Sequence, residues 1–172
     1  MAIDGNKVCV IGISHLGAVT SVCLSDLGYT VVGVDKDRQK VDQLNNGQPP
    51  IYEPELEELL EKNLKSQNLR YTNDFTIAIA DTRYVLITYD TPVDETDEVD
   101  LSELFTTINE IAPLLQNGTT VIISSQVPVG TCEQLAETIR KSNTSLSFGL
   151  AYTPENLRLG QAIERFKNPD MI

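Results

Sequence analysis

Short runs of apolar residues alternate along the chain with stretches in which apolar residues recur at helical spacing. The runs are nearly continuous and rich in valine and isoleucine, which is typical of strands buried on both faces of a sheet. We expect six strands, at residues 7–11, 29–35, 69–72, 84–88, 120–124 and 146–151. Helical spacing between them predicts helices at residues 16–27, 36–46, 56–64, 74–80, 101–115 and 131–141. This alternation predicts an α/β fold with a doubly wound, mostly parallel sheet and helices on both faces.

Length and charge narrow the classes of protein that fit this pattern. With 172 residues, the chain is expected to form one domain, spanning residues 1–172. Thirteen Lys and Arg against 25 Asp and Glu give a net charge of −12, which disfavours nucleic acid as a partner. No apolar run approaches the roughly 20 residues that span a bilayer, so no membrane association is expected.

Cysteine and histidine usage indicates a reducing compartment and no metal site. Cys9 and Cys23 lie in apolar patterns that predict buried thiols, and Cys132 stands apart from both. An odd number of cysteines without a visible signal peptide predicts a cytoplasmic protein. A single histidine, His15, makes a histidine-based metal site improbable.

A glycine-rich turn follows the first strand. Gly12 would permit the tight turn and Gly17 the close packing of helix on strand, while Ser14 stands where such turns carry a middle glycine. The helix start offers free N–H groups to phosphates. Asp35, at the end of the second strand, is placed to accept a hydrogen bond from a ribose hydroxyl. The pattern is that of a Rossmann-type dinucleotide-binding fold.

Two interpretations of this turn remain open from the residues alone. It is either a dinucleotide site or a tight strand-to-helix turn followed by a solvated aspartate. In the first case Asp35 disfavours a 2′-phosphate and favours NAD over NADP. Lys36, Arg38 and Lys40 follow closely and weaken that preference.

Three further segments, at residues 50–54, 127–131 and 154–158, fall in loops expected at the carboxyl edge of the sheet. Together with the glycine-rich turn, their order and spacing resemble the N-terminal NAD-binding domain of the UDP-glucose/GDP-mannose dehydrogenase family, over residues 7–172. The resemblance implies an enzyme, a nucleotide-sugar 6-dehydrogenase. In this family NAD oxidises the C6 alcohol of a nucleotide-sugar substrate twice, to the uronic acid. It also implies a homodimer for the full-length family protein.

The resemblance implies roles for individual residues. The pyrophosphate of NAD would be held by Gly12, Ile13, Ser14, His15, Leu16 and Gly17, and the adenosine ribose by Asp35 and Lys40. Two later loops would line the cofactor through Tyr89, Asp90, Thr91, Pro92, Ser125, Gln126 and Val127. The nucleotide sugar would contact Glu155, Asn156, Leu157, Arg158 and Leu159.

Glu155 matches the family's acid, which handles the water or proton during the second oxidation. A partly desolvated carboxyl suits such work because burial moves its pKa towards operating pH. The alternative is an ordinary glutamate that follows Pro154 at a helix start. The resemblance places the family's catalytic lysine and cysteine beyond Ile172, so the chain on its own is expected to be inactive.

Some positions depart from the family pattern, namely Ser14, His15, Asp90, Gln126 and Leu159. His15 is interpreted as a surface residue at the helix start, and Asp90 as a negative charge in a loop that faces NAD. These departures support an alternative, a degenerate and non-catalytic dinucleotide-binding module. An S-adenosylmethionine-dependent methyltransferase and a Rossmann dehydrogenase of hydroxy acids or acyl-CoA are further alternatives.

Overall fold

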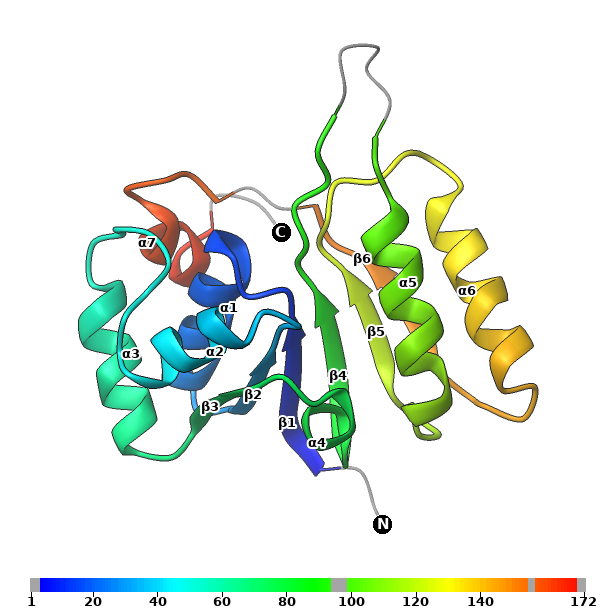
Figure 1. Cartoon of the computed structure of the whole chain (residues 1–172), viewed down its shortest axis with the longest axis horizontal. Helices are drawn as coiled ribbons and strands as arrows, with labels where there is room; N and C mark the ends of the chain where they lie inside the picture. The colour runs from blue at the N-terminus through cyan, green and yellow to red at the C-terminus, as the bar shows by residue number, and fades with distance from the viewer. Residues whose placement is uncertain (1–3, 94–98, 155–156, 170–172) are drawn as a thin grey trace.

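The computed structural model describes residues 4–93, 99–154 and 157–169, and its centre is a six-stranded sheet (Figure 1). The strands are β1 (Asp4–Ile11), β2 (Thr30–Val34), β3 (Leu69–Thr72), β4 (Thr82–Ile87), β5 (Thr120–Ile123) and β6 (Gly149–Tyr152). They pair in parallel throughout, in the order β3-β2-β1-β4-β5-β6. The predicted doubly wound α/β class is therefore confirmed. The strand order reverses between β1 and β4, which is where sheets of this class bind their ligands.

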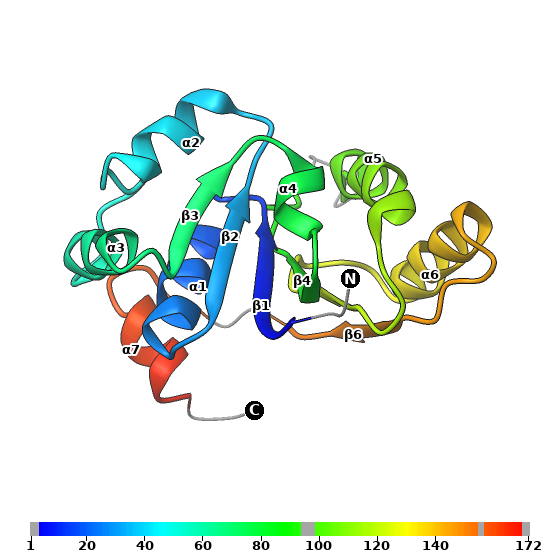
Figure 2. The same cartoon turned by 90° about the horizontal axis from the view of Figure 1, so that it is seen from below.

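Helices cover both faces of the sheet (Figure 2). One face carries α1 (His15–Asp26), α2 (Arg38–Asn45), α3 (Leu56–Lys65) and α7 (Ala162–Lys167). The other carries α4 (Phe75–Ile79), α5 (Ser102–Ile111), the 3₁₀ turn η1 (Ala112–Leu114) and α6 (Thr131–Ser142). Side chains alternate along a strand, so Val8 and Val10 pack on the first face while Cys9 and Ile11 pack on the second.

Local chemistry sets the ends of several helices. Asp37 accepts hydrogen bonds from the backbone N–H groups of the first turn of α2, and Asp74 does the same for α4. The helix predicted over residues 101–115 is shorter, because α5 ends at Ile111 and a 3₁₀ turn follows. Pro113 has no N–H and its ring crowds the preceding turn, which ends the α-helix there. The sixth strand also begins at Gly149 rather than three residues earlier.

The thiols of the core are free and unreactive. Cys9 and Cys23 are buried, as predicted, while Cys132 is partly exposed. Burial raises the pKa of both buried thiols, to about 12 for Cys23, so both stay protonated at neutral pH. None of the helices in the described ranges is both long and apolar enough to cross a bilayer.

Asp26, the last residue of α1, forms ion pairs with two neighbouring helices. Its carboxylate accepts hydrogen bonds from Lys62 Nζ of α3 at 2.6 Å and from Lys167 Nζ of α7 at 2.8 Å. The bond from Lys167, followed by the bond from Lys62, lowers the pKa of Asp26. The carboxylate thus ties α3 and α7 to the end of α1.

A pH-dependent loss of stability is expected from this arrangement. The pKa of Asp26 is lower in the folded protein than in the unfolded chain, where it is about 4. Its ion pairs therefore stabilise the fold above about pH 4, and this stabilisation is lost as the pH falls through the folded-state pKa. The Asp26→Asn variant is expected to lose about 1 kcal/mol of unfolding free energy at pH 7. Urea denaturation of both proteins from pH 7 to pH 3 should show the difference shrinking with acidity. A constant difference would contradict an ionic role for Asp26.

Candidate functional site

The glycine-rich turn joins β1 to α1 at the carboxyl edge of the sheet. Gly12 has a φ of +86°, and its N–H donates to the carbonyl of Val34 at 3.0 Å. A Cβ on Gly12 would lie 2.7 Å from the ring of Tyr89, and one on Gly17 would lie 1.8 Å from the carbonyl oxygen of Gly12. Both glycines therefore meet a backbone or packing requirement of the turn, as the sequence predicts.

Ser14 fits the turn without strain. Its φ of −70° lies in a region open to any residue, so the backbone does not need glycine there. Ser14 is the N-cap of α1, yet its side chain makes no capping bond, and within the described ranges its buried Oγ has no hydrogen-bond partner. A buried hydroxyl without a partner at a helix start suits an anionic ligand, which could accept its hydrogen.

Asp35 is buried at the end of β2 and holds the turn in place. Its Oδ2 accepts a hydrogen bond from the N–H of Ile13 at 3.1 Å, and its Oδ1 accepts one from the N–H of Asp37 at 3.0 Å. Lys40 Nζ lies 3.7 Å from Oδ2. The sequence predicts Asp35 as a ligand-binding acid, but its additional role in shaping the turn was missed because it depends on tertiary contact.

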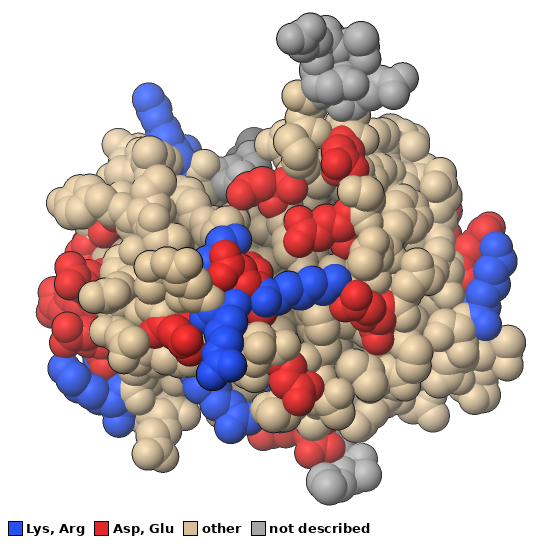
Figure 3. Space-filling view, viewed as in Figure 1, with Lys and Arg blue, Asp and Glu red and all other residues tan. Residues whose placement is uncertain are grey.

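The three basic residues that follow Asp35 each lie beside a carboxylate. The pairs are Lys36 with Glu110 (2.8 Å), Arg38 with Asp42 (3.8 Å) and Lys40 with Asp35 (3.7 Å). Figure 3 shows the same mixture on this face, where a line of basic side chains crosses the middle among acidic groups. These cations are already compensated, so they offer less to a 2′-phosphate than the sequence alone suggests.

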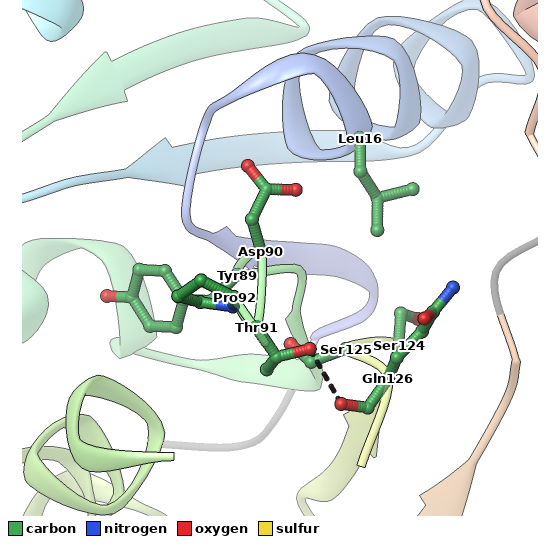
Figure 4. A pocket seen from close by; sticks show the side chains of 8 residues that line it. All are labelled: Leu16, Tyr89, Asp90, Thr91, Pro92, Ser124, Ser125 and Gln126. Atoms are coloured by element: carbon green, nitrogen blue, oxygen red, sulfur yellow. Dashed lines mark hydrogen bonds between the residues drawn. The ribbon is translucent and has the colours of Figure 1, made fainter. Parts of the chain in front are cut away.

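A cavity of about 250 Å³ opens beside the point where the strand order reverses. It lies between the start of α1 and the loops after β4 and β5 (Figure 4), and is lined by Leu16, Tyr89, Asp90, Thr91, Pro92, Ser124, Ser125 and Gln126. All of these except Ser124 belong to the predicted cofactor-binding set. Ser124 was assigned to a strand, although its position at a strand's carboxyl end was a signal for the site. Val127 instead packs against the core on the face of α5 and α6.

Polar groups of two loops meet in this cavity. Thr91 Oγ1 donates to the carbonyl oxygen of Gln126 at 2.7 Å and so joins the loops (Figure 4). Ser125 Oγ is buried and has no hydrogen-bond partner in the described part of the chain. The exposed carboxylate of Asp90 points towards the glycine-rich turn (Figure 4). The cavity thus offers the buried, unpartnered hydroxyl of Ser125 and the negative charge of Asp90.

Tyr89 supports the cavity wall and is no acid or base at neutral pH. Its ring packs against Gly12, and its hydroxyl accepts a hydrogen bond from Thr107 Oγ1 of α5 at 3.1 Å. Burial raises the pKa of Tyr89 to about 12. The phenol therefore stays protonated at neutral pH. Through these two contacts Tyr89 connects the turn to α5.

Together, the cradle of small residues, the two unpartnered hydroxyls and the buried Asp35 fit a dinucleotide. Residues 6–172 match the UDP-glucose/GDP-mannose dehydrogenase family, NAD binding domain. The chain belongs to this family. The methyltransferase and the other Rossmann dehydrogenases are thereby excluded as its family.

Relatives of the UDP-glucose/GDP-mannose dehydrogenase family are similar over nearly the whole chain. A UDP-glucose 6-dehydrogenase of Rhizobium meliloti is 41% identical over 167 residues, which is 96% of this chain and 38% of that protein. A GDP-mannose 6-dehydrogenase of Pseudomonas syringae pv. tomato is 36% identical over 172 residues, covering 96% of this chain and 39% of that protein. The chain therefore spans about two fifths of the length of these relatives.

Solved structures of the family share the fold. The GDP-mannose dehydrogenase of Pseudomonas aeruginosa, in a ternary complex, aligns with a TM-score of 0.89 at 32% identity, over 94% of this chain and 39% of that one. The UDP-glucose dehydrogenase of Pyrobaculum islandicum aligns with a TM-score of 0.89 at 31% identity, over 99% of this chain and 41% of that one.

His15 is not the simple surface residue that the sequence suggests. Its Nε2 lies 3.3 Å from Oε2 of Glu53, whose side chain is only 1% exposed. Glu53 also accepts hydrogen bonds from the backbone N–H groups of Gly160 and Ala162, each at 2.8 Å. Glu53 was missed as a site residue, although its segment, residues 50–54, was among those that carry the family resemblance.

The predicted substrate-binding residues form the connection between β6 and α7. Glu155, the predicted catalytic residue, and Asn156 lie outside the described residues. Leu157 packs against the cluster around α1, while Arg158 and Leu159 are exposed. The structure therefore places the end of this connection next to α1, near the glycine-rich turn.

Proposed function

We propose that this chain binds NAD⁺ as the cofactor domain, residues 1–172, of a cytoplasmic and homodimeric nucleotide-sugar 6-dehydrogenase. One observation carries the proposal. At the reversal point of the sheet, a glycine-rich turn, a buried acid after β2 and a cavity between the β4 and β5 loops come together in a chain of this family. Names of relatives, UDP-glucose and GDP-mannose 6-dehydrogenase, support a nucleotide sugar as substrate.

Different residues of the chain would bind different parts of the cofactor. The N–H groups at the start of α1 and the Ser14 hydroxyl would bind the pyrophosphate. Asp35 would accept a hydrogen bond from the adenosine ribose. The nicotinamide end would lie in the cavity beside Thr91 and Ser125. When bound, NAD⁺ supplies the acceptor for hydride from the C6 carbon of the substrate.

The connection after β6 would carry the substrate. Glu155 would handle the proton or water of the second oxidation, and residues 156–159 would contact the nucleotide sugar. Because Arg158 and Leu159 are exposed, their side chains are open to a ligand at this edge of the sheet. Hydride transfer needs substrate and cofactor in register, so the position of this connection relative to the turn matters for catalysis.

Calorimetric titration of the chain with NAD⁺ and NADP⁺ tests the proposal. We expect saturable NAD⁺ binding and about tenfold or more weaker NADP⁺ binding, since the cations behind Asp35 are paired with carboxylates. A folded chain that binds neither dinucleotide would contradict the proposal. It would instead favour the degenerate module, which the Asp90 carboxylate in the cavity supports.

A substitution of Asp90 tests whether its negative charge weakens NAD⁺ binding, as the degenerate-module alternative requires. An exposed carboxylate near the cofactor should repel it weakly, so we expect Asp90→Asn to tighten NAD⁺ binding by up to about fivefold. The increase should disappear at 0.5 M salt, because screening removes the repulsion. An unchanged affinity at low salt would show that the carboxylate does not face the bound cofactor.

A further inference from the structure

Glu53 is a buried carboxylate in the loop before α3. Its side chain is 1% exposed and its two oxygens serve three groups, the N–H of Gly160, the N–H of Ala162 and the imidazole of His15. A buried carboxylate is costly unless it is hydrogen-bonded, and these three partners give both of its oxygens a hydrogen-bond partner. The loop of Glu53, the start of α1 and the start of α7 therefore meet at one carboxylate.

Two of these bonds fix the far end of the connection that follows β6. This connection leaves the edge strand β6 and arrives at α7, which packs against α1 on the other side of the molecule (Figure 1). At its start the N–H of Thr153 donates to the carbonyl of Ile123 in β5 at 3.0 Å. At its end Glu53 holds Gly160 and Ala162. Residues 157–159, the described part of the segment proposed to bind substrate, lie between these two anchors.

The third bond reaches the cofactor turn. His15 is the first residue of α1 and belongs to the turn proposed to hold the pyrophosphate. Its Nε2 lies 3.3 Å from Glu53 Oε2, the same oxygen that accepts from Gly160. One carboxylate oxygen thus contacts both the cofactor turn and the substrate-bearing connection.

We propose that Glu53 is a positioning residue that sets the connection of residues 157–162 against the cofactor turn, with His15 as the link between them. The inference rests on the proposed function, since it assigns the two sides to cofactor and substrate. Ordering of the turn by NAD⁺ restrains His15, and through Glu53 it restrains the amides of Gly160 and Ala162. Cofactor binding therefore steadies the connection that carries the substrate contacts.

Amide hydrogen exchange of the full chain, measured by NMR with and without saturating NAD⁺, tests this role. In the wild type, NAD⁺ should slow exchange at Gly160 and Ala162 by about fivefold or more. Glu53→Gln leaves only one acceptor oxygen, so at least one of the two amides loses its acceptor and should exchange about tenfold faster or more, and the NAD⁺ effect should disappear. His15→Ala keeps both amide bonds to Glu53 but should also lose the NAD⁺ effect.

Asp26→Asn is the matched control, because Asp26 fastens the opposite end of α7 through Lys167 without touching Gly160 or Ala162. It should keep the NAD⁺ effect at both amides. A wild type that binds NAD⁺ without slower exchange at these amides would overturn the coupling, and wild-type exchange rates in Glu53→Gln would overturn the positioning role. A chain that does not bind NAD⁺ overturns the proposed function and the coupling together, and calorimetry identifies that outcome separately. If Glu53→Gln does not fold, His15→Ala decides the coupling.

Discussion

The Gly17→Ala variant is expected to lose about 3 kcal/mol or more of its free energy of unfolding, and saturable NAD⁺ binding with it. A Cβ at this position would lie 1.8 Å from the carbonyl oxygen of Gly12 and 2.7 Å from Thr88 Oγ1. The first obstacle is backbone, which cannot rotate away as the end of a side chain can. Thr88 Oγ1 is also committed, because it donates to the carbonyls of Ile11 and Gly12. The start of α1 must therefore move away from β1.

Two other glycines provide matched controls for this loss. Gly28 has a φ of +98° and nothing within 4 Å of a Cβ, so Gly28→Ala should cost only backbone strain of about 1 kcal/mol. Gly5 has neither a positive φ nor a close neighbour, and Gly5→Ala should leave stability nearly unchanged. Urea denaturation gives all three values. A Gly17→Ala variant as stable as Gly28→Ala would show that the turn can open without cost.

The fold was predictable because its signals are local. Continuous runs of valine and isoleucine mark strands buried on both faces, and Gly28 and Gly47 follow the first two helices. A helix boundary that was predicted wrongly also has a local cause. Pro113 ends α5 four residues before the predicted boundary because a proline cannot supply the next N–H, and this was readable from the sequence.

The cavity was predictable in part, since the loops after parallel strands gather at one edge of the sheet. Leu16, residues 89–92 of the first loop and residues 125–126 of the second line it, as expected from their places in the chain, whereas Val127 does not. The contacts of Glu53 were not predictable in this way. They join positions separated by 38 and by more than 100 residues, and no periodicity carries information over such distances.

Asp35 was predictable from the sequence in its position but not in its contacts. Its replacement is expected to have the second large effect, on both stability and NAD⁺ binding. Its place at the end of β2 was readable from the sequence, but its hydrogen bonds to the N–H groups of Ile13 and Asp37 were not. Asp35→Ala would leave the buried Ile13 N–H without its acceptor, at a cost of about 1–3 kcal/mol. A loss of NAD⁺ binding in that variant would therefore mix damage to the turn with loss of the ribose contact.

Asp35→Asn separates these effects better. Its amide oxygen can still accept from one backbone N–H, while the negative charge that favours a ribose hydroxyl and repels a 2′-phosphate is removed. A hydrogen bond to a charged group is worth about 1.5–3 kcal/mol, so NAD⁺ affinity should fall by about tenfold or more. Affinity for NADP⁺ should fall less, which narrows the preference for NAD⁺.

Asp37→Asn is the control for Asp35→Asn, because Asp37 is the next acid in the same loop and, in the contacts described, its carboxylate accepts only from the first turn of α2. Asparagine is also a good N-cap residue, so both the stability and the NAD⁺ affinity of Asp37→Asn should stay close to wild type. Calorimetric titrations well below the melting temperatures of all variants compare folded proteins only. If Asp35 made no contact with the cofactor, folded Asp35→Asn would bind NAD⁺ nearly as tightly as Asp37→Asn. A loss of about tenfold or more, together with a narrower preference for NAD⁺ over NADP⁺, would identify the contact with the ribose.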